Sequence, residues 1–293
     1  MRKEIDFMGK SKIFITISLI LIAVSIVSIF TRGFNFGVEF TGGSEIIVRF
    51  EDKQVTESDI RTAISQISEE FAKARIVAVR SAGDPSNVQK YSIIVPKTYE
   101  PDEKQKIQEE AEKLLSGKVV SFNEISGTAA EEIRRGTWTA ILVALVVLLI
   151  YITIRFRFIF GVAAVVALIH DVLITMGFFS LFGYEINVAA VAAFLTLLGY
   201  SLNDTIVLSD RIRENMKKYR GRNMVNIVNM SINQVLARTI NTSLTTFFVV
   251  FVLLLFAGNA VKPFAFGMTV GTIVGTYSSL YIASPIIVKW TKQ

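Results

Sequence analysis

Six long apolar stretches constrain this chain more than any other feature of its sequence. They cover residues 12–30, 136–154, 159–182, 186–208, 239–257 and 264–288. A bilayer core is crossed by about 20 predominantly apolar residues of α-helix, so each stretch is long enough to span it. Hydrophobic residues make up 52% of the chain and charged residues only 19%, with a mean hydropathy of +0.50. These values favour a polytopic α-helical membrane protein with six transmembrane helices.

The first apolar stretch follows several basic residues and could be mistaken for a secretory signal. Its apolar run is too long for one, and the "SIFTRGF" that follows has no small-residue cleavage pattern. We therefore expect this stretch to be a retained transmembrane helix.

Basic residues near the ends of the apolar stretches predict the orientation, because cytoplasmic loops carry an excess of Lys and Arg. The two short loops on one side, around 183–185 and 258–263, contribute only Lys262. The opposite side is therefore cytoplasmic and carries both termini. Its basic residues are Arg2, Lys3, Lys10, Lys12, Arg155, Arg157, Arg211, Arg213, Lys217, Lys218, Arg220, Arg222, Arg238, Lys289 and Lys292. Topology thus explains the net charge of +6, and we expect no nucleic-acid partner.

Residues 35–135 have an ordinary soluble composition and would lie outside the cytoplasm. Strand-like alternation at 44–50, 75–80, 90–96 and 118–126 and helical spacing at 56–74 and 101–117 give the order βαββαβ. Thr56 is the expected N-cap of the first helix, and Pro101 and Gly117 bracket the second. This order predicts a ferredoxin-like α+β domain between the first two transmembrane helices. We see no catalytic constellation in it.

The predicted organisation is therefore tripartite. Residues 1–34 form a cytoplasmic tail and the first helix, residues 35–135 the extracytoplasmic α+β domain, and residues 136–293 a five-helix bundle. Residues 211–237 have apolar positions at helical spacing beside a basic face, which indicates an amphipathic segment on the inner membrane surface.

Asp204 is the most informative polar residue inside an apolar stretch. An Asp at mid-membrane costs roughly 2.5–3.5 kcal/mol on insertion scales, so such a residue usually faces a bundle interior or an aqueous path. Asn203 is its neighbour, and Arg238 begins the next helix at a similar depth. A nearby guanidinium favours the charged acid and burial favours the neutral acid. We predict that these three residues, together with Asp171, form an ion-coupling site, against the simpler interpretation that Asp204 only hydrogen-bonds a neighbouring helix and Arg238 only reaches the interface.

Asp171 and His170 lie near the middle of the third stretch. Adjacent helical positions point about 100° apart, so both cannot face one partner. We expect Asp171 to face the bundle interior, with a bond to the Asn203–Asp204 region, and His170 to make a structural hydrogen bond.

Small residues recur every four positions in the sixth stretch, at Gly267, Gly271 and Gly275. Such a stripe allows two helices to approach closely. Packing is the default interpretation, although the stripe is also a candidate contact for another subunit.

The chain has no cysteine and a single histidine. Disulfides, thiolate nucleophiles and Cys-based or multi-His metal sites are therefore excluded, and we expect no metal, no cofactor and no catalytic residues.

Several longer motifs together resemble the SecF family of protein translocase subunits, within the resistance-nodulation-division superfamily. They are "FGVEFTGG" after the first stretch, "LIHDVLITMGFF" in the third, "GYSLNDTIVLSDRIREN" across the fourth and "ARTINTSLTT" opening the fifth. The first motif contains Gly42 and Gly43. Glu39 departs from the family, which usually has Asp at that position; we regard the change as conservative.

The resemblance implies a function that the spacing alone does not. Members of the family work with SecD beside the SecYEG channel and use the proton motive force, or a sodium gradient, to promote late export of an unfolded polypeptide across the bacterial or archaeal cytoplasmic membrane. Asp204 matches the family's ion-path acid and Arg238 its partner arginine. Gly42, Gly43, Gly267, Gly271 and Gly275 become candidates for contact with the polypeptide or a partner.

Three rival interpretations remain at this point. A half-transporter of a proton-coupled small-molecule efflux pump would show similar ion chemistry, but such pumps normally carry twelve spans and two large outer domains in one chain. An intramembrane aspartyl protease would need Asp171 and Asp204 to share a proton in near contact. A structural scaffold would make Asp204 and Arg238 dispensable.

Overall fold

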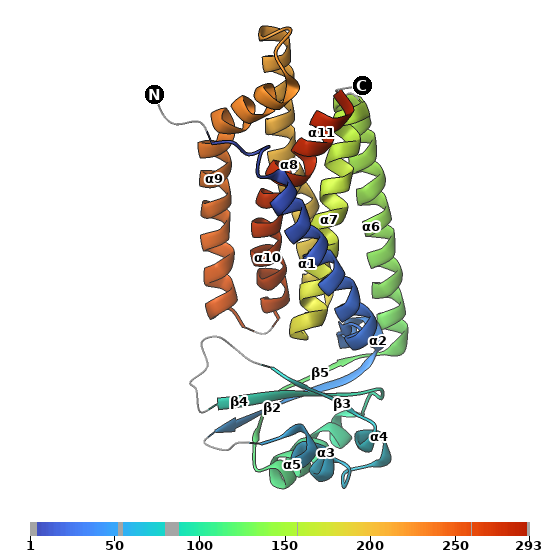
Figure 1. Cartoon of the computed structure of the whole chain (residues 1–293). Coiled ribbons are helices and arrows are strands. Elements are labelled where there is room, and N and C mark those ends of the chain that lie inside the picture. The colour runs from blue at the N-terminus through green and yellow to red at the C-terminus, as the bar shows by residue number, and fades with distance from the viewer. Residues whose placement is uncertain (1–4, 52–54, 80–87, 157, 259, 292–293) are drawn as a thin grey trace. The chain divides into compact units, whose positions relative to one another are not determined.

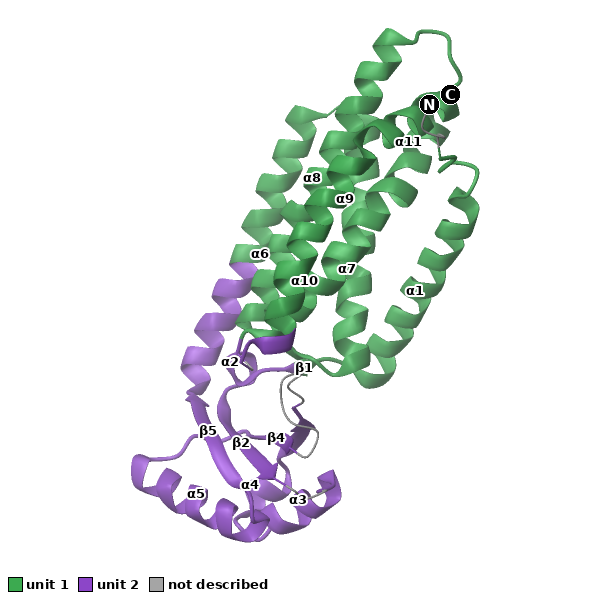
Figure 2. Cartoon of the chain, turned by 90° about the vertical axis from the view of Figure 1, so that its left-hand side faces the viewer, with its two compact units in different colours: residues 1–35, 140–254, 261–293 green, residues 36–139, 255–260 purple. Residues whose placement is uncertain are grey.

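The chain divides into two compact units, which are coloured separately in Figure 2. The computed structural model describes residues 5–51, 55–79, 88–156, 158–258 and 260–291. The membrane unit comprises residues 1–35, 140–254 and 261–293, and the sheet unit comprises residues 36–139 and 255–260.

Six helices within the described residues are long and apolar enough to cross a membrane, as predicted. Figure 1 shows them as a bundle of long, roughly aligned helices. Short strands, β1 (Asn35–Phe36) and β6 (Glu185–Ile186), lie in the connections. The six spans are α1 (Ser11–Arg32), α6 (Gly127–Arg155), α7 (Phe158–Phe182), α8 (Val188–Lys218), α9 (Met224–Phe256) and a composite of α10 (Lys262–Ser278), η1 (Ser279–Ala283) and α11 (Ser284–Thr291).

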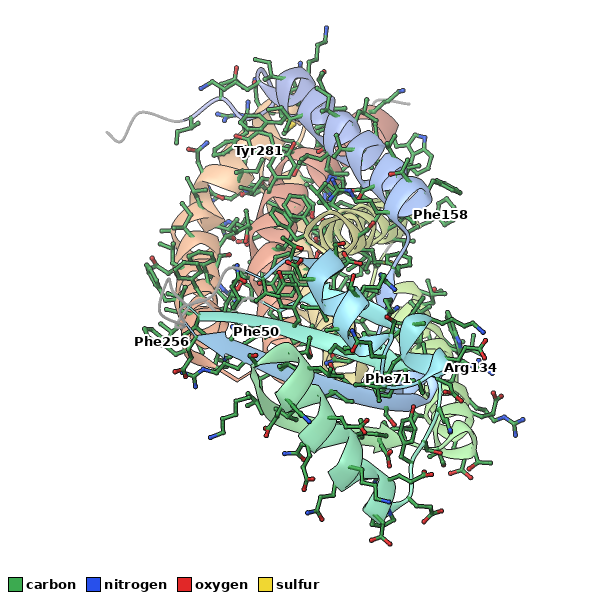
Figure 3. All side chains as sticks on the ribbon, turned by 90° about the horizontal axis from the view of Figure 1, so that it is seen from below. Phe50, Phe71, Arg134, Phe158, Phe256 and Tyr281 are labelled. Atoms are coloured by element: carbon green, nitrogen blue, oxygen red, sulfur yellow. The ribbon has the colours of Figure 1, made fainter. Side chains whose placement is uncertain are left out.

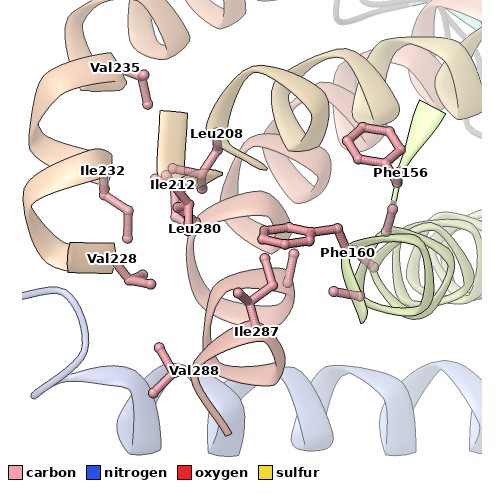
Figure 4. Close-up of a cluster of buried hydrophobic side chains, with 14 of the residues drawn as sticks. Phe156, Phe160, Leu208, Ile212, Val228, Ile232, Val235, Leu280, Ile287 and Val288 are labelled. Carbon is pink, nitrogen blue, oxygen red and sulfur yellow. The ribbon is translucent and has the colours of Figure 1, made fainter. Parts of the chain in front are cut away.

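The interior of the membrane unit is built where α7, α8, α9 and the composite helix converge (Figure 4). Side chains from residues distant in sequence meet there, because each helix turns one apolar stripe inward. The cluster includes Phe160, Leu208, Ile212, Val228, Ile232, Val235, Leu280, Ile287 and Val288.

Other helices expose apolar side chains instead. Leu142 and Val146 of α6, and Phe248 and Val252 of the second half of α9, are exposed. A helix that is apolar yet exposed fits a lipid environment, since lipid tails solvate such side chains as well as a protein core does.

Two asparagines of α9 hold the segment that precedes α1. Asn233 accepts a hydrogen bond from the Ile5 backbone amide (3.0 Å) and donates one to the Ile5 carbonyl (2.9 Å). Asn229 accepts from the backbone amides of Phe7 and Met8 at 3.0 and 2.9 Å. A side-chain amide can pair with both backbone groups of an extended residue, so these two positions tie the segment to α9.

The predicted amphipathic segment, residues 211–237, falls on the last turns of α8 and the first half of α9. Between the two helices, Gly221 has a φ of 85°, which a glycine adopts without strain. The location of this segment on a membrane surface stays a prediction.

The sheet unit contains an antiparallel four-stranded sheet in the order β3-β4-β2-β5. Its strands are β2 (Gly43–Glu51), β3 (Arg75–Ala78), β4 (Val88–Val95) and β5 (Lys118–Ile125). Helices α3 (Glu57–Ile64), α4 (Glu69–Ala72) and α5 (Pro101–Leu115) pack on it, and the short α2 (Val38–Thr41) precedes β2. Phe50 and Phe71, labelled in Figure 3, belong to the core between the sheet and these helices.

Local sequence signals explain most helix boundaries in this unit. Thr56 caps α3 as predicted: its hydroxyl accepts from the Asp59 amide, and the Asp59 carboxylate accepts from the Thr56 amide. The predicted single helix over 56–74 is wrong, because a turn after Ile64 separates α3 from α4. Ser68 is extended there, with φ −163° and ψ 170°, which ends one helix and starts another.

The end of α5 also differs from expectation. Pro101 occupies the first turn as predicted, but the residue in the left-handed conformation is Ser116, with a φ of 50°, and not Gly117. Gly117 is needed for another reason: a Cβ there would lie 2.8 Å from Phe50 and Val48 atoms. The turn-like sequence predicted at 82–87 lies outside the described residues.

Gly42 and Gly43 turn the chain into β2, with φ of 70° and 108°. A Cβ at Gly42 would lie 3.3 Å from the Gly127 Cα. A Cβ at Gly43 would lie 2.2 Å from the Val95 carbonyl oxygen and 3.0 Å from the Pro96 Cα, both backbone atoms. Sterics and the positive φ therefore both require glycine at position 43.

Glu124 of β5 joins three parts of the sheet unit. It accepts hydrogen bonds from the Ser44 hydroxyl (2.9 Å) and the Tyr99 amide (2.8 Å), and it forms an ion pair with Lys104. Burial acts to raise the pKa of this carboxyl, but Lys104 and the two hydrogen bonds outweigh it and hold the pKa below its ordinary value.

We predict that Gly43→Ala destabilises the chain by about 2–4 kcal/mol, from overpacking against Val95 and from the left-handed strain. Thermal unfolding of the full chain in detergent checks this. Gly136→Ala is the control, because a Cβ at that position of α6 meets no atom within 4 Å. Equal midpoints for the two variants would contradict the steric argument.

We predict that stability of the sheet unit falls as the pH drops below the ordinary glutamate pKa of 4.5. The sign follows from linkage: the folded state binds the Glu124 proton more weakly than the unfolded state, so acid favours unfolding. Amide hydrogen exchange of β5 measures the effect. Glu124→Gln is expected to flatten this pH dependence, whereas Glu110→Gln, at an exposed position on α5, is expected to retain it.

Candidate ion-coupling site in the membrane unit

Asp204 is buried in α8, with 4% of its surface exposed. Its Oδ2 has no hydrogen-bond partner among the described residues, and neither has the hydroxyl of Tyr200, one turn earlier on the same helix face. The groups that act on the Asp204 carboxylate come from α9: Ser243 lies near it, and Arg238 acts by Coulombic attraction. A buried acid with a bare oxygen is costly to keep charged, so this position is suited to take up and release a cation.

Arg238 does not form an ion pair with Asp204 in this structure, as judged over the part of the chain that is described. The reason lies in the rotation of α9. Thr239 faces the interior and is buried, so the preceding Arg238 points to the exposed side of the helix. Asp204 of α8 and Arg238 of α9 therefore attract each other electrostatically but do not form an ion pair.

Asn203 points away from Asp204. It is exposed, whereas Asp204 and Thr205 are buried. Successive positions of a helix differ by about 100°, so burying Asp204 turns Asn203 outward.

Asp171 is fully buried at the centre of a second polar cluster. Its Oδ1 lies 2.8 Å from Nδ1 of His170, and its Oδ2 accepts hydrogen bonds from the hydroxyls of Ser201 and, at 2.8 Å, Ser278. The expected bond to the Asn203–Asp204 region is thus made by Ser201 instead, one turn earlier on α8. Within the described residues Asp204 is not among the hydrogen-bond partners of the Asp171 carboxylate, so the two acids do not make the near contact that a protease dyad requires.

His170 makes the structural hydrogen bonds expected of it, and it contacts Asp171 itself. Its Nε2 lies 3.0 Å from the Ser18 hydroxyl of α1, which in turn lies 2.8 Å from the hydroxyl of Tyr277 on α10. Tyr277 donates to the backbone carbonyl of Phe14. This chain of contacts links α7, α1 and α10.

A single π-helical turn, η1, follows directly after Tyr277 and Ser278. The Ser284 hydroxyl donates to the Ser279 carbonyl at 3.2 Å, which supports the widened turn. Such π-bulges inside α-helices occur frequently at functional sites. Here it lies directly after Ser278, whose hydroxyl donates to the Asp171 carboxylate.

The glycine stripe of α10 packs within the chain. A Cβ at Gly267 would lie 2.9 Å from the Ala193 Cβ, and one at Gly271 would lie 2.6 Å from the Leu197 Cδ1. Gly275 faces Ser201, with the Asp171 Oδ2 3.5 Å from the ideal Cβ position. The stripe thus brings α10 against α8 and positions the Asp171 cluster.

The sequence reasoning missed the equally close contact of α1 with α7. A Cβ at Gly177 would lie 2.5 Å from the Ser25 Cα and 2.1 Å from the Ser25 Cβ. The Ser28 and Ser180 hydroxyls meet at 3.0 Å nearby. The available signal was the repeated serine at Ser18, Ser25 and Ser28 within an otherwise apolar helix, all three of which are buried.

Within the described residues, no group of three or more His, Cys, Asp or Glu side chains lies close enough to hold a metal ion. The polar groups of the site are carboxylates, hydroxyls, one imidazole and one guanidinium. Such a set can bind and exchange a proton or a small monovalent cation.

Fold and site together define a multi-pass membrane protein that combines an α+β unit with buried acids in its helical bundle. A family model described as "Protein export membrane protein SecD/SecF, C-terminal" matches residues 104–293, and the "SecD/SecF GG Motif" matches residues 27–54, which include Gly42 and Gly43. The chain belongs to the SecD/SecF family. Proteins of this family are export subunits and not catalytic enzymes, in agreement with the prediction.

Relatives align over nearly the whole chain. It is 52% identical to the protein translocase subunit SecF of Petrotoga mobilis, over 99% of this chain and 97% of that protein. It is 35% identical to the protein translocase subunit SecDF of Thermus thermophilus, over 98% of this chain but 39% of that protein. The crystal structure of SecDF from that organism matches with a TM-score of 0.86 at 34% identity, covering 100% of this chain and 39% of that one. A structure of SecDF in a super-membrane-facing form gives 0.68.

We predict that Gly177→Ala destabilises the membrane unit by about 1–3 kcal/mol, because the new methyl group would overlap the Ser25 backbone and force α1 away from α7. Thermal unfolding in detergent measures this. Gly199→Ala provides the control, since its Cβ meets nothing within 4 Å. An unchanged midpoint for Gly177→Ala would show that α1 is not fixed against α7.

Proposed function

We propose that the chain is an auxiliary subunit of the Sec translocase that works with SecD and uses an ion gradient to promote late export of unfolded polypeptides. Its relatives over nearly the full length bear the name of protein translocase subunit SecF. The single-chain SecDF relative, of which this chain matches 39%, supports a SecD protein as the missing remainder. SecYEG and the moving polypeptide are the further partners that this role requires.

The observation that carries the coupling mechanism is the buried carboxylate of Asp204 with an unpartnered oxygen. In the arrangement described here, Arg238 acts on it from the next helix without closing an ion pair. A shift of α9 that turned Arg238 inward would stabilise the carboxylate, and a shift outward would favour uptake of a cation. Alternating between the two arrangements moves one ion per cycle.

A membrane potential supplies enough free energy to shift the balance between two arrangements of the helices. A membrane potential supplies about 2.3 kcal/mol per elementary charge per 100 mV. Conformations of a protein that differ by a few kcal/mol are both populated under such a bias. One ion passing Asp204 therefore suffices to change the population of two helix arrangements.

The sheet unit serves as the module that acts on the polypeptide in this proposal. Its βαββαβ order, with the strand order β3-β4-β2-β5, supports a ferredoxin-like domain. The distribution of basic residues supports a location outside the cytoplasm for residues 35–135, with both termini inside. The host membrane is then a bacterial or archaeal cytoplasmic membrane.

The glycine positions divide between two roles in this scheme. Gly42 and Gly43 shape the entry into β2, so a contact with the polypeptide or SecD there would use their backbone. Gly267, Gly271 and Gly275 are already covered by α8, so their contribution to partner contact is indirect, through the position of α10.

We predict that Asp204→Asn keeps folding and assembly with SecD but abolishes stimulation by the gradient, because an amide cannot exchange the ion. The measurement is export of a secretory protein by vesicles that contain this chain, SecD and SecYEG, with and without an imposed proton gradient, and separately a sodium gradient.

Asp210→Asn is the matched control for this experiment. Asp210 lies six residues later on α8 and is partly exposed, where it pairs with Arg155 and with Arg213 at 3.2 Å. This variant is expected to retain gradient stimulation. A stimulated Asp204→Asn variant would place the coupling elsewhere and make Asp204 a structural residue.

A further inference from the structure

A continuous series of hydrogen bonds runs from Asp171 to Phe14, and the donor and the acceptor of its bonds can be assigned one after another. It runs through His170, Ser18 and Tyr277, and each contact is 3.0 Å or shorter. All these side chains belong to the membrane unit, and His170, Asp171 and Ser18 are buried. Each hydroxyl in the chain has one hydrogen to donate, so fixing one donor fixes the next.

The direction is set at the Phe14 end. A backbone carbonyl only accepts, so the Tyr277 hydrogen is donated to Phe14. The contact between Tyr277 and Ser18 must then use the Ser18 hydrogen. Ser18 has no second hydrogen, so the contact between Ser18 and His170 requires that the ring nitrogen Nε2 carries the proton.

The same count of hydrogens determines how many protons the His170–Asp171 pair carries. With Nε2 protonated, two arrangements remain for the Nδ1 to Oδ1 contact of 2.8 Å: an imidazolium beside a carboxylate, or a neutral ring beside a protonated carboxyl. Both contain the same number of protons and both are neutral overall. The carboxylate oxygen on the other side, Oδ2, is occupied as an acceptor from Ser201 and Ser278.

We propose that His170 and Asp171 form a second proton-binding site of the membrane unit, which holds one proton between Nδ1 and Oδ1 and is separate from Asp204. The use of this proton in ion coupling rests on the proposed function; its presence rests only on the contacts above. A neutral pair fits its burial, because an isolated charge at this position would cost several kcal/mol.

The surroundings supply few other charges to the pair. From α10 and η1 the titratable groups are Tyr277 and Tyr281, and from α8 the acid Asp204 follows Ser201 by about one turn. Helix α11 carries Lys289 in its last turn. Helix α1 presents the Ser18 hydroxyl to the pair, and its charged side chains, Lys12 and Arg32, lie at its two ends, where Arg32 donates to the Leu181 carbonyl at 2.8 Å.

The pair releases a proton when the donor and acceptor roles of His170 and Ser18 are exchanged. If α1 moves away from α10, the Ser18 hydroxyl is free to rotate and donate to Nε2. The Nε2 proton then leaves to water that the opening admits, the ring becomes the Nδ1–H tautomer, which donates to the Asp171 carboxylate, and the pair has lost one proton. Opening the contact of α1 with α10, while α1 stays against α7, is therefore coupled to deprotonation of the pair.

Nitrogen-15 NMR of the full chain in lipid bilayers tests this directly. His170 is the only histidine of the sequence, so ¹⁵N-histidine labelling, with a purification tag that lacks histidine, gives the signals of one imidazole ring. We expect Nε2 to carry a proton near neutral pH, as imidazolium or as the Nε2–H tautomer. A neutral ring with the proton on Nδ1 and a bare Nε2 would overturn the proposal.

Two variants test whether the hydroxyls of Ser18 and Tyr277 determine the protonation of the His170 ring. Tyr277→Phe frees the Ser18 hydrogen, so the ratio of Nδ1–H to Nε2-protonated ring is expected to rise about tenfold, the effect of one hydrogen bond. Thr175→Val is the control: it also removes a buried hydroxyl, but one that donates to the Asp171 carbonyl at 2.7 Å. It is expected to leave the ratio unchanged.

The outcomes separate this inference from the proposed function. An Nε2-bound proton together with a gradient-responsive Asp204→Asn variant would support the His170–Asp171 site and reject Asp204 as the coupling acid. A bare Nε2 together with an unresponsive Asp204→Asn variant would reject the His170–Asp171 site and leave Asp204 in place.

Discussion

The burial of the Asp171 carboxylate is the constraint on which the arrangement of the membrane unit depends. An unpaired buried charge is so unfavourable that every acceptor position must be filled by a donor or neutralised by a proton. The donors come from α8 through Ser201, from α10 through Ser278, and from the neighbouring His170, which α1 supports through Ser18. One side chain of α7 thus fixes the rotation of three other helices.

Those short contacts are possible only where the helices have no bulk between them. Gly275 leaves room for Ser201 and for the Asp171 carboxylate, and Gly177 lets α1 approach until Ser25 touches the α7 backbone. Apolar surface cannot drive such association inside a lipid bilayer, because lipid solvates it equally well. Close packing of small residues and polar contacts between helices take over that role, and the structure combines them at the same place.

Much of this organisation could be predicted from the sequence, because apolar length and single buried charges are strong signals. The six spans, the Thr56 cap and the burial of Asp204 follow from them. The direction of Arg238 could not be predicted, since it depends on the rotation of α9, which is fixed by distant contacts such as that of Asn233 with Ile5. The break between α3 and α4 was missed because Ile64 and Phe71 fit one helical period, yet both reach the same core only when the chain turns between them.

The pairing of His170 with Asp171 is a contact that the rule about helix faces did not predict. Two adjacent positions cannot face one distant partner, but they can face each other when the longer side chain bends back to the shorter one.

This pairing distinguishes the environments of the two buried acids, Asp171 and Asp204. Asp171 has both oxygens engaged, and in the proposal its pair with His170 is neutral overall and changes protonation only when the helices around it move. Asp204 has a bare oxygen and an arginine that is near but not bound, so it can change state while the bundle stays in place. In the proposed function the two acids would divide the work: Asp204 would exchange the ion, and the protonation of the His170–Asp171 pair would follow the packing of the helices.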